Sequence, residues 1–224
     1  MLTNHKNYFL LIIFVFFSNM IAAEENPYIF IDDNAQLMVK TLKNNKQLFA
    51  KDRELFEDKI KEIFEPMIDF RRISASVMGK KYYTQASKAQ RVEFVTIFKD
   101  SLLDTYAETL AQWDDQAINT IFLDYSASPE LKKIEIRQEL NTGDSIYPII
   151  YKLRRADESW AITNIIINGV NLGLTFRNQF RALADEHKGD VSLTIDNWVS
   201  DAGNAGCLVY TCAAAEERDS VDRG

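Results

Sequence analysis

The sequence predicts an α+β domain in which helices wrap a four-stranded, twisted antiparallel sheet meander, with an apolar cavity between the sheet and the helices. Three observations support this class. Apolar residues recur at helical spacing up to Trp113, strand-like runs with short turns follow, and helical spacing returns after Gly169. Because short connections join successive strands, each strand is expected to pair antiparallel with the next.

Three helices are expected early in the domain. Asp32-Asp33 and Asp52 can each cap a helix, because a short side-chain oxygen accepts a hydrogen bond from a first-turn N–H group. Pro66 suits the first turn of the third helix, and the end of that helix is expected at Gly79.

The longest predicted helix begins at Ser87–Gln90, which matches a capping box, and extends to about Trp113. Its apolar residues cover a wide arc, since Phe94 and Ile97 flank the main row. Such an arc indicates deep burial or the wall of a cavity. A final helix is expected over Val191–Val199.

Four strands are expected, over Ile118–Tyr125, Lys132–Leu140, Ser145–Arg155 and Trp160–Ile167. The second strand alternates between apolar and charged residues, so its charged side is expected to face water. The third and fourth strands carry apolar residues on both faces. Either both faces are covered, or one face lines an enclosed apolar space.

Both ends of the chain are expected to lie outside this domain. Residues 1–23 combine a basic residue, the apolar run Tyr8–Phe17 and two small residues, as in a cleavable signal peptide. The apolar run is too short to span a membrane, although an uncleaved anchor is the alternative interpretation. One exported domain is predicted over residues 24–200, with a poorly ordered C-terminal tail over 201–224.

Composition argues against several classes of partner. The formal net charge of −7 and the lack of a basic stripe argue against nucleic acid. After the leader, His187 is the one histidine, and no CxxC pair occurs, so no metal site is expected. Cys207 and Cys212 could form a disulfide in an oxidising compartment, or both could remain free thiols.

No catalytic constellation is visible in the sequence, which lacks a nucleophile elbow, a phosphate-binding Gly-rich loop and an HExxH motif. A hairpin turn explains Gly143-Asp144-Ser145 better than a lipase motif does. His187 is interpreted as part of a solvated helix end, and Asp69 as a solvent-facing or salt-bridged residue beside Arg71 and Arg72. We therefore expect neither enzymatic activity nor a cofactor.

The segment 160–180 predicts a strand, an Asn168-Gly169 turn and an amphipathic helix. It resembles the signature of the MlaC family, also called the Ttg2 toluene-tolerance family. The matching residues are Trp160, Gly169, Val170, Leu172, Phe176, Arg177, Gln179 and Phe180. Three asparagines differ from the family pattern, in which Asp, Glu and Ser are usual: Asn164, Asn168 and Asn171.

A second, earlier block strengthens this resemblance, because two blocks in the correct order are more specific than one. It matches at Gly79, Tyr82 or Tyr83, Ala86, Ser87, Gln90, Arg91, Phe94, Phe98 and Leu102. Together with the strands between the blocks, the resemblance covers roughly residues 26–198.

The resemblance implies a periplasmic phospholipid carrier that shuttles lipids between the outer and inner membranes and so maintains outer-membrane lipid asymmetry. The implied partners are an inner-membrane ABC transporter complex with an MCE-domain subunit and an outer-membrane complex of a lipoprotein with a porin. The carrier itself is expected to be a monomer. Exposed charge on the second strand, or Arg177 and Arg181, could meet these partners, with a role in solubility as the alternative.

Acyl chains would then lie between the sheet and the helices, with the headgroup near the mouth. The candidate lining residues are Phe70, Ile73, Val77, Phe94, Phe98, Leu102, Ile149, Tyr151, Leu153, Ile165, Ile167, Val170 and Leu174. Ordinary core packing is the alternative for each of them. Two other functions stay open. One is an exported enzyme that acts on a small apolar substrate, which requires a buried carboxylate or Tyr with a shifted pKa. The other is an interaction module without lipid cargo.

Overall fold

The computed structural model describes residues 25–200 except 127, 129 and 157–158. The predicted signal peptide, the tail and both cysteines therefore lie outside the described residues. The helices are α1 (Pro27–Asn44), α2 (Leu48–Lys51), α3 (Arg53–Met67), α4 (Phe70–Gln85), α5 (Lys88–Ala111), α6 (Leu172–Glu186) and α7 (Val191–Asp196). The strands are β1 (Ala117–Ile121), β2 (Lys133–Asn141), β3 (Ile146–Ala156), β4 (Ser159–Ile167) and β5 (Val170–Asn171).

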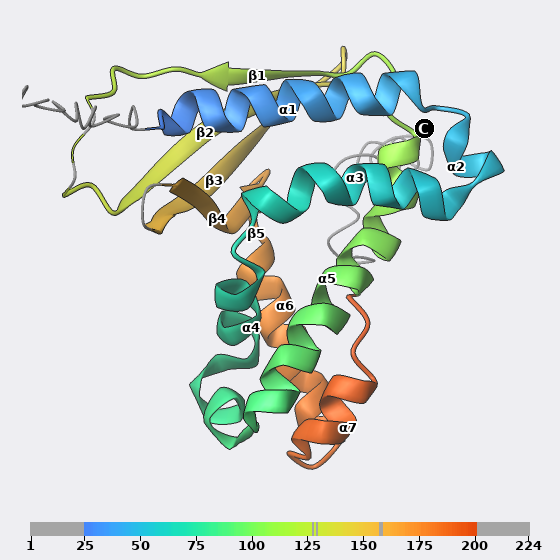
Figure 1. Ribbon diagram of the computed structural model, residues 1–224, viewed down its shortest axis with the longest axis vertical. Coiled ribbons are helices and arrows are strands. Elements are labelled where there is room, and N and C mark those ends of the chain that lie inside the picture. The colour runs from blue at the N-terminus through green and yellow to red at the C-terminus, as the bar shows by residue number, and fades with distance from the viewer. Residues whose placement is uncertain (1–24, 127, 129, 157–158, 201–224) are drawn as a thin grey trace, which may run out of the picture.

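The described strands form one sheet in sequence order, and every neighbouring pair is antiparallel (Figure 1). The predicted α+β class and meander are confirmed. The number of strands differs, because β5 pairs with the end of β4 where we expected the next helix to begin. Asn168 and Gly169 make the turn between these strands, with φ of 47° and 82°.

Of the four helix starts expected before Trp113, two are correct, and the final helix also begins at Val191 as expected. The Asp52 carboxylate accepts a hydrogen bond from the Leu55 N–H at 3.0 Å and caps α3. The Ser87 hydroxyl and the Gln90 side chain form the capping box that opens α5. In both places, a side-chain oxygen satisfies an N–H group that has no partner within the helix.

The expected cap at Asp32-Asp33 is wrong, because the residue that caps α1 is Asn26, six positions before Asp32. The Asn26 side chain accepts a hydrogen bond from the Tyr28 N–H at 2.9 Å. Burial of Tyr28 and Ile31 extends the apolar face of α1 toward its start. Asp32 instead accepts a hydrogen bond from the Thr120 hydroxyl at 2.6 Å and ties α1 to β1.

The expected start at Pro66 is also wrong, because Pro66 lies in the last turn of α3. The chain then becomes extended, and the Asp69 N–H donates to the Ile162 carbonyl of β4 at 3.0 Å. Asp69 caps α4 by accepting from the Arg72 N–H at 2.9 Å. Gly79 interrupts the helical backbone where the end of the helix was expected, with φ of 67° and ψ of 166°, and a further helical stretch of α4 follows it to Gln85.

Other boundaries differ by a few residues. β1 ends at Ile121 rather than Tyr125, because the chain leaves the sheet at Phe122 and Leu123, which are exposed. α7 ends at Asp196, so Trp198 packs against α5 from an extended segment. The charged face of β2 is directed to solvent as expected.

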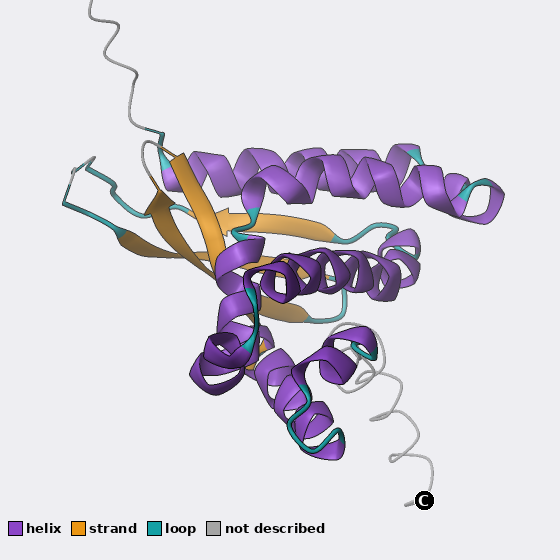
Figure 2. Ribbon diagram, turned by 60° about the horizontal axis from the view of Figure 1, so that its bottom comes forward, coloured by secondary structure: helices purple, strands orange, loops and turns teal. Residues whose placement is uncertain are grey.

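The described part of the chain has two hydrophobic cores. One lies between the sheet, α1 and α3, which run alongside each other (Figure 2). The other lies among α4, α5, α6 and α7, which project as a separate group of helices (Figure 1). Its aromatic rings pack with centroids between 5.0 and 6.1 Å apart. The candidate site lies where these two cores meet.

Candidate functional site

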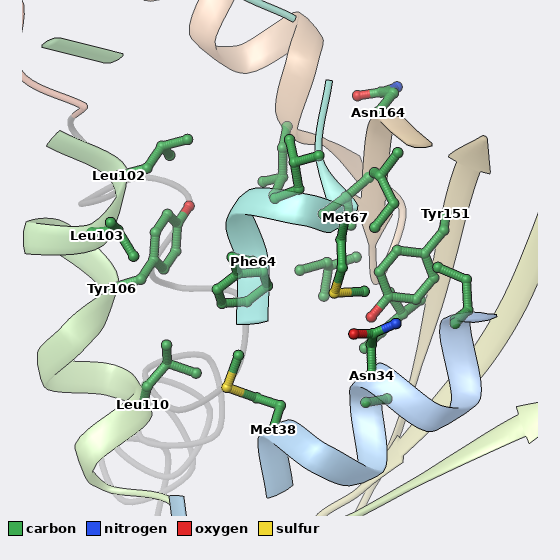
Figure 3. A pocket seen from close by; sticks show the side chains of 18 of the residues that line it. Asn34, Met38, Phe64, Met67, Leu102, Leu103, Tyr106, Leu110, Tyr151 and Asn164 are labelled. Carbon is green, nitrogen blue, oxygen red and sulfur yellow. The ribbon is translucent and has the colours of Figure 1, made fainter. Parts of the chain in front are cut away.

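An apolar cavity of about 300 Å³ lies between the sheet and the helices. Its walls come from α1, α3, α4, α5, α6 and from strands β1 to β4. Figure 3 shows Leu102, Leu103, Tyr106 and Leu110 of α5 on one side and Tyr151 of β3 on the other. The volume lies at the lower end of the range for pockets that bind small molecules.

Few polar groups reach this cavity. Among the described lining residues, the polar or charged ones are Asn34, Lys99, Tyr106, Thr109, Tyr151 and Asn164. None of the lining residues is Asp or Glu. Lys99 is paired with Glu65 at 2.5 Å, so its charge is already compensated. Such walls can hold hydrocarbon but offer little to a charged ligand.

Eight of the thirteen predicted lining residues contribute to the cavity: Phe70, Ile73, Phe98, Leu102, Ile149, Tyr151, Ile165 and Ile167. The strand residues among them follow the period of two that places alternate side chains on one face of a sheet. Several of these eight residues are half-buried rather than buried, because part of their surface faces the cavity. Whether any of them binds lipid stays a prediction.

The other five predicted residues are not among those that line the cavity. Val77 and Phe94 are fully buried in the aromatic core of α4 to α7, and Leu153 is buried in the sheet core beyond a β-bulge. Val170 belongs to β5 instead of a helix. Leu174 is 54% exposed, because the cap at Asn171 turns the inner face of α6 toward Leu172 and Phe176.

α1 and α3 also line the cavity, although no residue of either helix was predicted to do so. α1 supplies Ile31, Asn34, Ala35, Met38, Val39 and Leu42, and α3 supplies Phe64 and Met67. The row at positions 31, 35, 38 and 42 has the spacing of one helix face, so this signal was present. It was overlooked because the helix was expected to start near its second turn.

Three residues fix the start of α6 at the edge of the cavity. The Asn164 side-chain N–H donates to Asn171 Oδ1 at 3.0 Å, and the Gly173 N–H donates to Asn164 Oδ1 at 3.0 Å. Asn171 Oδ1 also accepts from the Leu174 N–H at 3.1 Å. A Cβ atom at Gly173 would lie 2.6 Å from Asn164 Oδ1, so this close approach requires glycine.

Burial changes the acidity of two tyrosines in the cavity wall. It raises the pKa of Tyr106 to about 12 and raises the pKa of Tyr151 as well, because the phenolate form loses hydration. Part of the Tyr151 surface is accessible, yet the residue is strongly desolvated. The reason is that its accessible surface faces the apolar cavity rather than bulk water, as Figure 3 shows for the ring.

The residues considered as catalytic candidates cap a helix, end a helix or form a turn. Asp69 caps α4 and pairs with Arg72 at 3.1 Å. His187 ends α6, and Gly143 lies in the turn between β2 and β3 with a φ of 92°. Within the described ranges, no cluster of three or more His, Cys, Asp or Glu is arranged to hold a metal ion. No described helix has both the length and the apolarity needed to cross a bilayer.

A second hollow, also of about 300 Å³, lies between α4 and α6. Lys80, Lys81, Arg177 and Arg181 surround it, together with Asp185. The Asp185 carboxylate accepts a hydrogen bond from the Tyr82 hydroxyl at 3.2 Å. Four cations therefore gather around one carboxylate, in a chain whose net charge is negative.

By its fold and its cavity, this protein is an α+β domain with an apolar space between an antiparallel meander and its helices. Residues 32–200 match the model of the MlaC protein family. The chain belongs to that family, which confirms the resemblance found in the sequence.

Relatives and a solved structure agree with this assignment. The toluene tolerance protein Ttg2D of Pseudomonas putida is 28% identical over 198 residues, covering 88% of this chain and 90% of its own. The intermembrane phospholipid transport system binding protein MlaC of Haemophilus influenzae is 22% identical over 178 residues, covering 75% and 80%. The structure of a phospholipid-binding protein from Ralstonia solanacearum, solved in complex with a phospholipid, has the same fold. Its TM-score is 0.69 at 21% identity, with coverage of 81% of this chain and 98% of that one.

Proposed function

We propose that this protein binds phospholipids and carries them by enclosing their acyl chains in the apolar cavity. The cavity itself is the main support, because its walls are almost wholly apolar. Each CH2 group removed from water is worth about 0.8 kcal/mol, so a lipid cannot cross an aqueous gap unaided at a useful rate. Inside the cavity the chains are nearly as favourable as in a bilayer, so uptake and release can both occur.

The proposed setting is the periplasm, with residues 1–23 as the export signal and lipid shuttling between the outer and inner membranes as the role. The name of the Haemophilus influenzae relative, an intermembrane phospholipid transport system binding protein, supports this setting. The toluene tolerance named for the Pseudomonas putida relative fits a role in maintaining outer-membrane lipid asymmetry.

A cavity of about 300 Å³ is small for two long chains, so loading requires the walls to separate further. The seam between α3 and α5 is suited to this movement. Three ion pairs cross it, Arg53–Asp104, Lys61–Asp100 and Lys99–Glu65, and at least one side chain of each is exposed. Exposed ion pairs contribute only about 0–1 kcal/mol each, so parting these helices costs little electrostatic energy.

Docking partners are proposed to be an inner-membrane ABC transporter with an MCE-domain subunit and an outer-membrane lipoprotein–porin complex. The basic hollow around Arg177 and Arg181 supports an acidic docking surface on one of them, since its positive charge exceeds what Asp185 compensates. Exchange of Arg177 and Arg181 for Glu should weaken capture by the partner that uses this hollow. Exchange of Lys40 and Lys43, which are exposed on α1, is the matched control.

An enzyme acting on an apolar substrate receives less support. That alternative needs a carboxylate or a Tyr in the cavity with a pKa suited to proton transfer. The described lining residues include no carboxylate, and burial moves the pKa of Tyr106 and Tyr151 away from neutrality. An interaction module with an ordinary filled core is also disfavoured, because it would have no cavity of this size.

The proposal is tested by extracting the purified mature protein and identifying its lipids by mass spectrometry. We expect phospholipid in a fixed ratio to protein. A preparation that holds none, and that also takes none up from phospholipid vesicles, would overturn the proposal.

A further inference from the structure

Tyr151 places a polar group on an otherwise apolar wall. Its side chain extends from β3, and Asn34 of α1 points toward it (Figure 3). Ile149, on the same face of β3, and Ile165, paired with Tyr151 on β4, line the cavity with aliphatic surface. A Phe in place of Tyr151 would continue that apolar surface, so the hydroxyl group calls for a physical explanation.

The Tyr151 hydroxyl makes no hydrogen bond to any other described group. The Tyr106 hydroxyl likewise has no partner, and its oxygen is completely buried. The Tyr151 oxygen is not among the completely buried atoms, and the Tyr151 side chain lines the cavity. A hydrogen-bond donor that faces an apolar space without a partner lowers stability, and such groups are rare in folded proteins.

The hydroxyl is suited to donate. Because burial raises the pKa of Tyr151, the phenol stays protonated throughout the neutral range. Asn34, whose side chain points toward Tyr151 in Figure 3, uses its side-chain N–H to donate to the Phe30 carbonyl at 2.7 Å. A ligand that brings a neutral hydrogen-bond acceptor on an otherwise apolar body would complete this site.

We propose that Tyr151 donates a hydrogen bond to an ester carbonyl oxygen of the bound lipid. This inference rests on the proposed function, since it names the part of the lipid that the cavity recognises. An ester carbonyl is a neutral acceptor directly attached to an acyl chain, which matches both requirements of the wall. The cavity then distinguishes ester-linked chains from ether-linked chains, which lack that oxygen.

The test compares two phospholipids that share headgroup and chain length, one diacyl with ester links and one dialkyl with ether links. Their dissociation constants are measured by displacement of a fluorescent lipid from the mature wild-type protein and from Y151F. We expect the ester-to-ether preference to fall about fivefold in Y151F, the effect of one hydrogen bond, with ether-lipid affinity unchanged. The difference in intrinsic hydrophobicity between the lipids cancels in this double comparison.

Y106F is the matched control, because it removes a hydroxyl from the same cavity whose oxygen, unlike that of Tyr151, is completely buried in the structure. It should keep the wild-type preference. Y151M removes the Tyr151 hydroxyl with a different side chain and guards against a folding defect of Y151F. Wild-type preference retained in both Tyr151 variants would overturn the inference and favour a water bridge at Tyr151. Wild-type protein that binds neither lipid would overturn the proposed function itself.

Discussion

Removal of bound lipid is expected to destabilise this protein by an amount that the cavity sets. In protein cores, an unfilled cavity costs about 24 cal/mol for each Å³. For a cavity of about 300 Å³ this gives on the order of 7 kcal/mol. The figure is an upper limit, because the walls can relax and water can enter. It is nevertheless comparable with the total stability of a typical domain, about 5–15 kcal/mol.

Calorimetry of lipid-free and reloaded protein measures this effect. In a domain of this size, 1 kcal/mol corresponds to about 2–4 °C in Tm, so lipid should raise Tm by at most roughly 14 to 28 °C. Reloading must restore the higher value. If the two forms melt within about 2 °C of each other, lipid does not fill the cavity and the reasoning fails.

Three further predictions concern the wall, its edge and the seam. L102W should reduce phospholipid uptake at least about tenfold by filling the cavity. V92W, at a 62% exposed site on the same helix, should not reduce it. Equal uptake by L102W and the wild-type protein would contradict the assignment of the cavity. G173A should lower the free energy of unfolding by about 1–3 kcal/mol through its clash with Asn164, although Gly to Ala in a helix ordinarily stabilises; stabilisation in urea would refute this. Lipid exchange should accelerate modestly as salt is raised to about 0.5 M, because the α3–α5 ion pairs are screened, and K152Q, which breaks a pair on the sheet, should leave the exchange rate unchanged. Exchange that is independent of salt would show that these ion pairs do not hold the seam closed.

Much of the fold could be predicted because its local signals agree with its tertiary structure. β2 alternates strictly, turn residues separate the strands, and the capping chemistry at Asp52 and Ser87 operates within one helical turn. Prediction failed where two signals competed. Asp32-Asp33 resembles a cap, but the side chain of Asp32 is used by β1, a partner distant in sequence.

The cavity was harder to predict than the fold, because periodicity identifies an inward face without showing whether that face is packed. Ile149, Tyr151, Ile165 and Ile167 were found from strand alternation. Phe94 and Phe98 lie one turn apart on α5, yet only Phe98 reaches the cavity, while Phe94 packs against Phe180. That difference depends on where α6 and α7 pack, which is a tertiary property.

The most direct test of the central claim uses a phospholipid with a photoreactive group in its acyl chain. After irradiation of the loaded protein, the labelled residues are identified by peptide mass spectrometry. We expect label on cavity walls contributed by separate elements, such as Met38, Leu102 and Ile165. Label confined to exposed apolar residues such as Ile29, Val92 and Leu174 would contradict the claim that the chains lie inside.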